Sequence, residues 1–318
     1  MRIHIIGTIN GETNEGMRNI ATHLSREFQK ENMVLQSGLR ELHKIIVNSI
    51  KADVTLIFAR ANQLTYYLSR LVTKLCRRTW IILVQKPDRQ FSMLNASHPL
   101  ACSYLSLTEG DLVDVSVLPG QEKRLFHVGI KKEKFVSVSL DKKKALRAKY
   151  GLESNKPLVI HVGHCSAGRG LEDFLYVNDV QKLVVASGMF ESQEVVSALE
   201  NDGVRIIRGY LENVEEIYQM ADVYLFPTKS TEFVISIPLS VMEALSCGIP
   251  VIGYESFRNL QEIKGKKDAI NLVNDPSEIS DLVKRLLNNP SSKSLLSDSY
   301  TWDEVATQVM GILQGDEK

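Results

Sequence analysis

A glycine-rich loop with one arginine, GHCSAGRG at residues 163–170, follows a β-branched run and precedes a helix expected to begin near Leu171. Glycines such as Gly163 let backbone amides approach a phosphate closely, and a helix N-terminus adds partial positive charge. Arg169 could then bind a diphosphate through two parallel hydrogen bonds and stabilise it as it leaves. An ordinary turn with a solvated arginine would give the same pattern.

A single carboxylate lies in an apolar stretch, PLSVMEALSCGIPVI at 238–252. Pro238 predicts the first turn of a helix, and Glu243 falls inside it between Met242 and Ala244. Burying a carboxylate there is costly unless a partner satisfies it. Two ribose hydroxyls would do so, and so would a structural partner within the chain.

These residues belong to a chain in which short β-branched runs alternate with amphipathic segments, which predicts parallel sheets covered by helices on both faces. Strands are expected at 2–7, 33–36, 53–59, 80–85, 112–118, 134–138, 157–163, 181–187, 204–207, 222–226, 249–253 and 269–273. In such α/β sheets ligands bind beyond the carboxyl ends of the strands. The loop 163–170 lies at such an end, and so does the weaker candidate formed by Gly209, Tyr210 and Leu211, which could meet the edge of a nucleobase.

A chain of 318 residues exceeds what one core usually serves, so two domains are expected. The break falls after Val138, where a polar helix is followed by Gly151 and a restart at Pro157. We therefore expect an N-terminal domain at 1–140 and a C-terminal domain at 141–300. The last amphipathic segment, within 301–318, could complete the first domain.

The composition, with 44% hydrophobic and 24% charged residues, is that of a folded globular protein. No apolar stretch has the length of a signal peptide or a membrane span, and the four cysteines have no paired spacing. A cytoplasmic location follows as an expectation. His161, His164 and Cys165 are close in sequence, but no second ligand group accompanies them, so no metal site is predicted and His161 is interpreted as a core histidine.

The net charge of zero conceals an asymmetry between the halves. Residues 1–140 carry a net charge of +7 and the remainder −7. Within the basic half, the segment 66–78 combines leucines with arginines and a lysine, so it could lie peripherally on the inner face of a membrane. A helix packed on its own sheet with basic residues in water gives the same pattern.

The second half resembles the donor domain of the retaining GT-B glycosyltransferases of glycosyltransferase family 4. The matching stretches are VGHCSAGRG (162–170), GYL (209–211), YQMAD (218–222), VYLFP (223–227) and PLSVMEALSCGIPVI (238–252), and the likeness covers most of residues 140–290. It implies two Rossmann-like domains facing a cleft. It also implies transfer of a hexosyl group from a UDP- or GDP-sugar to a glycan, lipid-linked or small-molecule acceptor. Neither a cofactor nor a nucleic-acid partner is implied.

The resemblance implies a role for each matching residue of the donor site. Glu243 takes the place of the second carboxylate of the family's Glu-seven-residues-Glu motif, which binds ribose. The first carboxylate position is Ile235, and Glu232 is the nearest alternative. The family's phosphate-binding arginine and lysine fall on His164 and Arg169. Arg169 keeps a permanent charge, and Lys229 is a candidate substitute for the cation that His164 only partly supplies. The backbone near Ile237, Leu239 and Ser240 would also contact the donor phosphate.

The acceptor is expected to enter from the first domain, where Asn14, Gly16 and Arg18 lie on the first strand-to-helix loop. Gln85 stands where the family often has a donor-contacting histidine. Two other functions stay open: a nucleotide-sugar-binding partner subunit without turnover, which Ile235 and His164 would explain, and a GT-B nucleotide-sugar epimerase. A nicotinamide dehydrogenase is disfavoured because the loop after residue 7 lacks the dinucleotide-binding glycine pattern.

Overall fold

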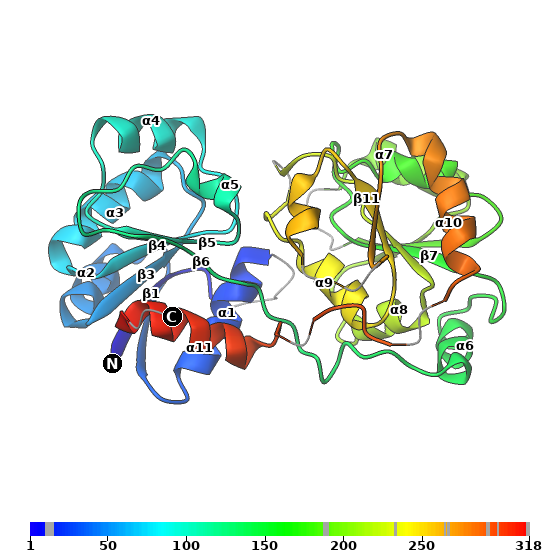
Figure 1. Ribbon diagram of the computed structural model, residues 1–318, viewed down its shortest axis with the longest axis horizontal. Helices are drawn as coiled ribbons and strands as arrows, with labels where there is room; N and C mark the ends of the chain where they lie inside the picture. The colour runs from blue at the N-terminus through cyan, green and yellow to red at the C-terminus, as the bar shows by residue number, and fades with distance from the viewer. Residues whose placement is uncertain are drawn as a thin grey trace. The chain divides into compact units, whose positions relative to one another are not determined.

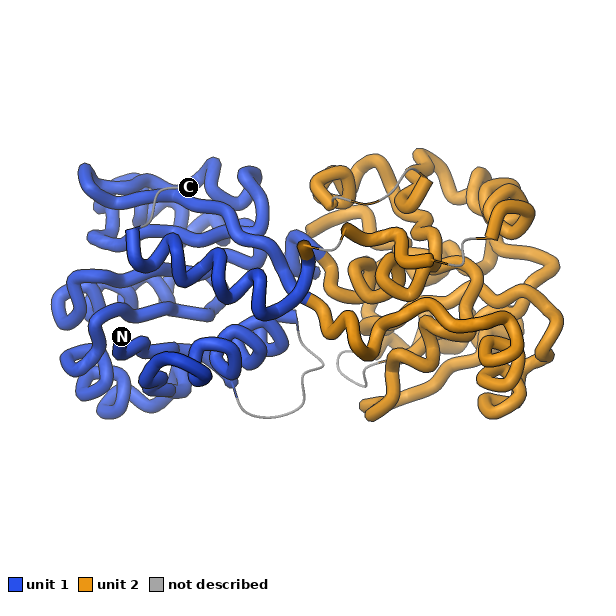
Figure 2. Tube along the Cα trace, turned by 60° about the horizontal axis from the view of Figure 1, so that its bottom comes forward, with its two compact units in different colours: residues 1–129, 234–237, 300–318 blue, residues 130–233, 238–299 orange. Residues whose placement is uncertain are grey.

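The computed structural model describes residues 1–9, 16–186, 191–231, 234–263, 265, 268–290, 293–297 and 299–315. The chain forms two compact units, coloured separately in Figure 2: unit 1 comprises 1–129, 234–237 and 300–318, and unit 2 comprises 130–233 and 238–299. Each unit contains a six-stranded parallel sheet with helices between its strands (Figure 1). The expected fold class, α/β with two doubly wound Rossmann-like units, is confirmed.

The sheet of unit 1 has the strand order β2-β1-β3-β4-β5-β6. Its central strands are buried on both faces because their sequences are nearly continuous apolar runs. The strands are β1 (Arg2–Gly7), β2 (Met33–Ser37), β3 (Val54–Phe58), β4 (Thr79–Leu83), β5 (Ser103–Ser106) and β6 (Lys123–Leu125). The helices are α1 (Gly16–Phe28), α2 (Leu42–Lys51), α3 (Gln63–Leu75), α4 (Arg89–Ser97), α5 (Glu109–Leu112) and α11 (Trp302–Gln314).

The C-terminal helix α11 is part of unit 1. Trp302 stacks on His23 of α1 with ring centroids 4.7 Å apart, and a Cβ on Gly129 would lie 2.7 Å from the Trp302 ring. A residue other than glycine at position 129 would therefore displace the first turn of α11.

The sheet of unit 2 has the order β12-β11-β10-β7-β8-β9, so the chain reverses its direction of winding between β7 and β10. The strands are β7 (Leu158–Gly163), β8 (Gln181–Ala186), β9 (Arg205–Arg208), β10 (Val223–Leu225), β11 (Val251–Tyr254) and β12 (Ile270–Val273). The helices are α6 (Leu140–Lys149), η1 (Leu171–Tyr176), α7 (Gln193–Asn201), α8 (Glu215–Met220), α9 (Leu239–Ser246), η3 (Arg258–Glu262), η4 (Pro276–Glu278) and α10 (Ile279–Leu287). A reversal of this kind is where open α/β sheets bind ligands.

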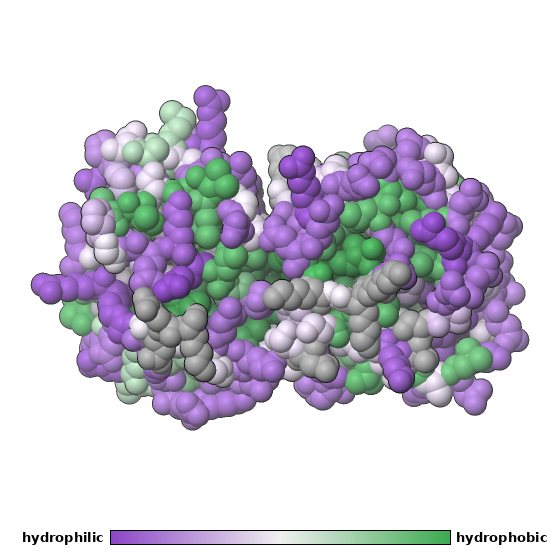
Figure 3. Space-filling view, viewed as in Figure 1, coloured by the Kyte–Doolittle hydropathy of each residue, from purple (hydrophilic) through white to green (hydrophobic). Residues whose placement is uncertain are grey.

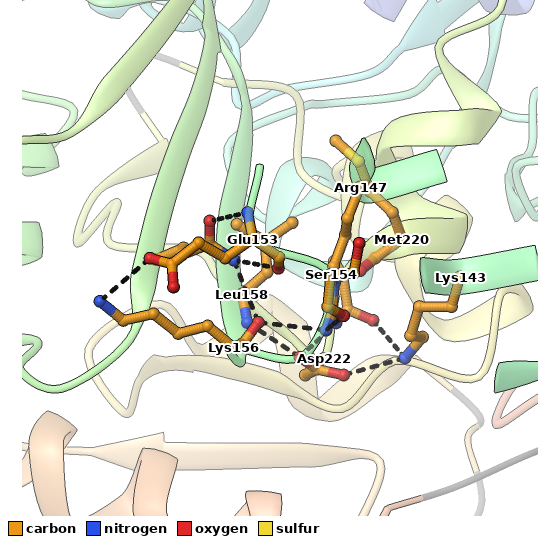
Figure 4. A network of polar contacts seen from close by, with 10 residues as sticks. Lys143, Arg147, Glu153, Ser154, Lys156, Leu158, Met220 and Asp222 are labelled. Atoms are coloured by element: carbon orange, nitrogen blue, oxygen red, sulfur yellow. Dashed lines mark hydrogen bonds and ion pairs between the residues drawn. The ribbon is translucent and has the colours of Figure 1, made fainter. Parts of the chain in front are cut away.

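A polar network fastens α6 to the central strands of unit 2 (Figure 4). The buried Arg147 donates to Asp222 at 2.5 Å and to the main-chain oxygen of Met220 at 2.9 Å. Asp222 also accepts from Lys143 at 3.0 Å and from the main-chain N–H of Leu158 at 2.8 Å. The network thus fixes the residues at the starts of β7 and β10, the two strands on either side of the reversal.

Two expected strands are wrong. Residues 112–118 continue from α5 into irregular chain, and 134–138 form an irregular connection. The fifth strand is instead β5, whose SYLS sequence offers little apolar pattern, and the sixth is β6. Thr108 caps α5 by accepting from the N–H of Asp111 at 3.3 Å, which favours a helical turn where the valines alone favour a strand.

Candidate functional site

The loops after β7 and β10 meet at the reversal in unit 2. Gly170 adopts φ +73°, and a Cβ at this position would lie 2.5 Å from the main-chain oxygen of Pro227. Thr228 reinforces the contact by donating to the main-chain oxygen of Arg169 at 3.3 Å. The glycine-rich loop is therefore held against the loop after β10, at the position where a ligand of this sheet would bind.

Arg169 brings a cation to this position. Its side chain is 4% exposed, and a Cβ on Gly163 would lie 2.8 Å from its Nη2 atom. Burial lowers the pKa of Arg169, yet an arginine starting from 12.5 stays charged near neutral pH. A buried cation of this kind can bind an anion more strongly than a solvated one.

Glu243 contributes a carboxylate from α9. The hydroxyl of Tyr218, which is fully buried on α8, donates to its Oε2 atom at 2.7 Å. Burial raises the pKa of Glu243 to about 7, and the bond from Tyr218 acts against this shift. Because a carboxylate has several acceptor positions, Glu243 can still accept hydrogen bonds from ligand hydroxyls.

A stack of rings connects the two sides of the site. Tyr218 stacks on Tyr224 of β10 at 5.9 Å between centroids, and Tyr224 stacks on His161 of β7 at 5.7 Å. Tyr224 also hydrogen-bonds Ser240 near the start of α9 and donates to the main-chain oxygen of Val162 at 3.2 Å. The stack therefore links the residue that bonds Glu243 to the strand that leads to Arg169.

These rings include functional candidates that the sequence reasoning did not assign to the site. Tyr218 and Tyr224 lie in the quoted YQMAD and VYLFP stretches, but their order in the chain gives no sign of the stacking. His161 carried a usable signal, because it precedes Gly163 by two residues in a strand and the two positions therefore face the same side of the sheet.

The other expected donor residues lie around the same strand ends. His164 is half-buried in the loop after β7, and Gly209, at φ +94°, begins the loop after β9 in which Tyr210 is 53% exposed and Leu211 half-buried. Leu239 and Ser240 are the first two residues of α9.

Lys229 is engaged elsewhere in unit 2. Its amine lies 3.5 Å from a carboxyl oxygen of Asp173 and 4.3 Å from the centre of the Tyr254 ring. The Tyr254 hydroxyl donates to the same Asp173 oxygen at 2.5 Å. To bind a donor phosphate, Lys229 would have to leave the carboxylate of Asp173.

The position of the missing carboxylate, Ile235, belongs to unit 1 and packs on Gly16: a Cβ there would lie 2.7 Å from the Cδ1 atom of Ile235. The next residue, Ser236, donates its N–H to the main-chain oxygen of Val84 at 2.7 Å and its hydroxyl to Asp111 at 2.8 Å. Burial raises the pKa of Asp111. The segment 234–237, which ends at the buried Ile237, is thus attached to the residues around β4 and α5.

Of the expected acceptor-side residues, Gly16 is the first residue of α1, Arg18 lies in its first turn and Gln85 follows β4. Asn14 and Glu232 lie outside the described residues. Within the described ranges, no three His, Cys, Asp or Glu side chains gather as metal ligands do. No helix in that part of the chain has the length and apolar character needed to cross a bilayer.

Part of the chain is similar to a recognised sequence family. Residues 170–289 match the family model of the glycosyl transferases group 1. The sulfoquinovosyl transferase SQD2 of Arabidopsis thaliana is 23% identical over 215 residues, which are 63% of this chain and 41% of that protein. The alpha-galactosylglucosyldiacylglycerol synthase of Streptococcus pneumoniae is 24% identical over 135 residues, 39% of this chain and 35% of that protein. The chain thus matches less than half the length of these two relatives.

Among solved structures, Anabaena HepE in complex with UDP and glucose superposes with a TM-score of 0.79, covering 99% of this chain and all of HepE at 11% identity. WaaG, a glycosyltransferase involved in lipopolysaccharide biosynthesis, gives a TM-score of 0.67 over 99% of this chain and 100% of its own at 12% identity. Identities this low bear on the fold, which is GT-B.

Proposed function

We propose that the chain is a retaining glycosyltransferase of family 4 type that moves a hexosyl group from a UDP- or GDP-sugar to an acceptor hydroxyl. The observation that carries this proposal is the placement of Glu243 and Arg169 in one unit, at the reversal of its sheet. A ribose diol and a diphosphate are the polar parts that all such donors share. A carboxylate and a buried cation are their natural partners.

In the proposed reaction the bond between the anomeric carbon and the diphosphate oxygen breaks. The acceptor oxygen bonds to the same face of that carbon, and the acceptor proton passes to the departing diphosphate. Arg169, the amides near Ile237, Leu239 and Ser240, and His164 or Lys229 would stabilise the leaving charge. Glu232, as the nearest replacement for the missing first carboxylate, would contact the transferred sugar. Neither a metal nor another cofactor is required by this scheme.

The test is nucleotide binding followed by product analysis. Thermal unfolding is measured with UDP, GDP, ADP and CMP, since a ligand at a hundred times its dissociation constant adds about 2.7 kcal/mol of stability. Glu243→Gln should reduce the shift, whereas Glu255→Gln, which changes an exposed carboxylate of the same unit, should preserve it. Absence of any shift with the wild-type protein would overturn the nucleotide-sugar proposal. NMR of the product would then show whether the anomeric configuration is retained.

The packing of Ile235 favours a second candidate, a nucleotide-sugar-binding partner subunit without turnover. Because its side chain lies on Gly16 where the family has a carboxylate, the contact to the transferred sugar is missing at that position. Nucleotide binding without product, over a panel of acceptors, would support this candidate. Consumption of a nucleotide sugar without an acceptor would indicate an epimerase.

We further propose a cytoplasmic location with peripheral contact to an anionic membrane through unit 1, where a lipid-linked acceptor would be presented. Between residues 54 and 108 the sequence has seven Lys or Arg and one acidic residue, Asp88. Helix α3 packs on its sheet through Tyr66 and Val72 but exposes Leu64 by 76% and Tyr67 by 51%. Figure 3 shows hydrophobic surface over the α4 and α5 part of this unit, and Met93 of α4 is 60% exposed.

Vesicle flotation tests the membrane proposal. The wild type should bind vesicles that contain anionic lipid, and this binding should weaken as the salt concentration is raised. It should not bind neutral vesicles. The triple substitution of Leu64, Tyr67 and Met93 by serine should weaken binding. Its control replaces three exposed apolar residues of unit 2, Leu140, Leu175 and Tyr176. Equal binding by both triple variants would contradict the proposal.

A further inference from the structure

His161 is a polar side chain in the interior of unit 2, on β7, with no exposed surface. Its Nδ1 atom lies 3.0 Å from the main-chain oxygen of Leu225. A carbonyl oxygen can only accept a hydrogen bond, so Nδ1 carries the ring proton and Nε2 presents a lone pair. Burial, together with the nearby charge of Arg169, lowers the pKa of His161 to about 3, so the ring is neutral at physiological pH.

The Nε2 atom of His161 is buried and has no hydrogen-bond partner among the residues that the structure describes. A Cβ placed on Gly163 would lie 2.8 Å from this atom and also 2.8 Å from Nη2 of Arg169. The two nitrogens therefore face the same small space, one as an acceptor and the other as a donor. A buried acceptor without a partner has lost its hydrogen bonds to water, and a hydrogen bond from Arg169 would replace one of them.

We propose that His161 is a positioning residue for Arg169: its Nε2 accepts a hydrogen bond from the guanidinium when a diphosphate is bound and thereby directs the remaining N–H groups at the diphosphate. The inference rests on the proposed function. A neutral acceptor suits this role because a carboxylate in the same place would neutralise the arginine. The imidazole instead orients the guanidinium and leaves its full charge for the leaving group.

The surroundings of His161 hold its ring in one orientation. Leu225 fixes the tautomer, and Tyr224 covers one face of the ring with an angle of 27° between the two planes. Tyr224 is itself tied to the main-chain oxygen of Val162 at 3.2 Å. A ring held in this way loses little freedom when it accepts the bond, which is the requirement for a preorganised site.

His161→Phe tests the inference, because phenylalanine keeps the stacked ring and removes Nε2. The probes are inorganic pyrophosphate, the nucleoside diphosphate that binds the wild type, and the corresponding nucleoside. We expect His161→Phe to weaken both diphosphate-containing probes at least about tenfold and to leave the nucleoside unchanged, since hydrogen bonds to charged groups are the stronger ones. The control, Glu255→Gln, changes an exposed side chain of the same unit and should bind all three probes as the wild type does.

Repeating the measurement in an Arg169→Ala background separates positioning from packing. If His161 acts through Arg169, His161→Phe should change pyrophosphate affinity there by less than about twofold. If His161→Phe does not fold, Gly163→Ala tests the same contact, because its methyl group would force the two nitrogens apart. The same loss is expected, with nucleoside binding as the check on folding.

Three results would overturn the inference. Unchanged pyrophosphate affinity in His161→Phe would remove the role of Nε2, and an equal loss in the Arg169→Ala background would assign the effect to packing. A wild-type protein that binds neither a nucleoside diphosphate nor pyrophosphate would overturn the proposed function as well. In the first two cases, nucleotide binding by the wild type would leave the proposed function in place.

Discussion

Glu243→Gln provides a quantitative test of the donor site, because it removes a charge and keeps the size of the side chain. Burial raises the pKa of Glu243 from 4.5 to about 7. In the unfolded chain the carboxyl group ionises at its ordinary value, so folding disfavours its charged form. The resulting loss of stability is absent below pH 4.5 and grows as the pH rises towards the folded pKa.

The magnitude follows from the two pKa values. One pKa unit corresponds to about 1.4 kcal/mol, so the ionised carboxylate costs unit 2 up to about 3 kcal/mol at pH 8 and less than about 1 kcal/mol at pH 5. Solvent at the partly exposed side chain lowers both figures. Relative to the wild type, Glu243→Gln should therefore gain about 2 kcal/mol between pH 5 and pH 8. Its amide oxygen can still accept the bond from Tyr218.

The assay must report on unit 2 by itself, and the cysteines allow this. Cys165 in unit 2 and Cys102 in unit 1 are both fully buried free thiols. Thiol labelling across a urea series, read peptide by peptide by mass spectrometry, gives the free energy of unfolding at each position. The pH-dependent gain of Glu243→Gln should appear at Cys165 and be absent at Cys102. Glu255→Gln, at an exposed position, is the matched control.

One result would refute the reasoning about Glu243. If the difference between Glu243→Gln and the wild type at Cys165 is the same at pH 5 and pH 8, the carboxylate is not penalised by burial. The same titration predicts ligand binding: the ionised form accepts ribose hydroxyls, so wild-type affinity for UDP or GDP should rise up to about tenfold from pH 6 to pH 8. The glutamine variant should lack this additional pH dependence.

Three other substitutions test the surrounding framework. Asp222→Asn should destabilise unit 2 by about 3 kcal/mol or more, because it leaves the buried cation of Arg147 without a full countercharge. Urea unfolding measures this change in the free energy of unfolding. A loss below about 1 kcal/mol would contradict the importance of the network in Figure 4. Gly170→Ala should reduce nucleotide affinity and stability together, since its methyl group would meet the oxygen of Pro227 and its φ is positive; calorimetry showing wild-type binding would refute this contact. Burial lowers the pKa of His4 to about 4, so the wild type should lose stability in unit 1 as the pH falls from 6.5 to 4. His4→Gln should remove part of that loss, which thiol labelling at Cys76 and Cys102, the buried cysteines of unit 1, would measure.

The strands of unit 2 could be predicted because each is a compact apolar run between turn residues. The errors in unit 1 arose where local pattern and tertiary environment disagree. Val113 lies in the expected strand 112–118 but is 73% exposed, so its β-branched side chain carries no information about a sheet. In β5, Ser103 accepts from the N–H of Glu122 and Ser106 donates to the main-chain oxygen of Thr108. Those hydrogen bonds offset the cost of burying two serines. In the sequence alone, serines at these positions argue against a buried strand.

The site was predictable to the extent that its residues occupy single motifs. Glu243 stands out as a carboxylate in an apolar helix, and Arg169 as the cation of a glycine-rich loop. Tyr218 could not be assigned, because its bond to Glu243 spans 25 residues and depends on the packing of α8 on α9. The sequence shows that Ile235 stands where the resemblance implies a carboxylate, and only the structure shows that its side chain packs on Gly16.

The topology of unit 2 explains why so much of the candidate site lies in one unit. The strand order reverses between β7 and β10, and open α/β sheets bind ligands at the carboxyl ends of such strands. The loops bearing Gly163 and Pro227 follow these two strands. Helix α8 adds Tyr218 to the ring stack of β7 and β10, and Tyr218 in turn bonds Glu243 of α9. Contacts to the ribose and the diphosphate can therefore be tested in unit 2 without reference to unit 1.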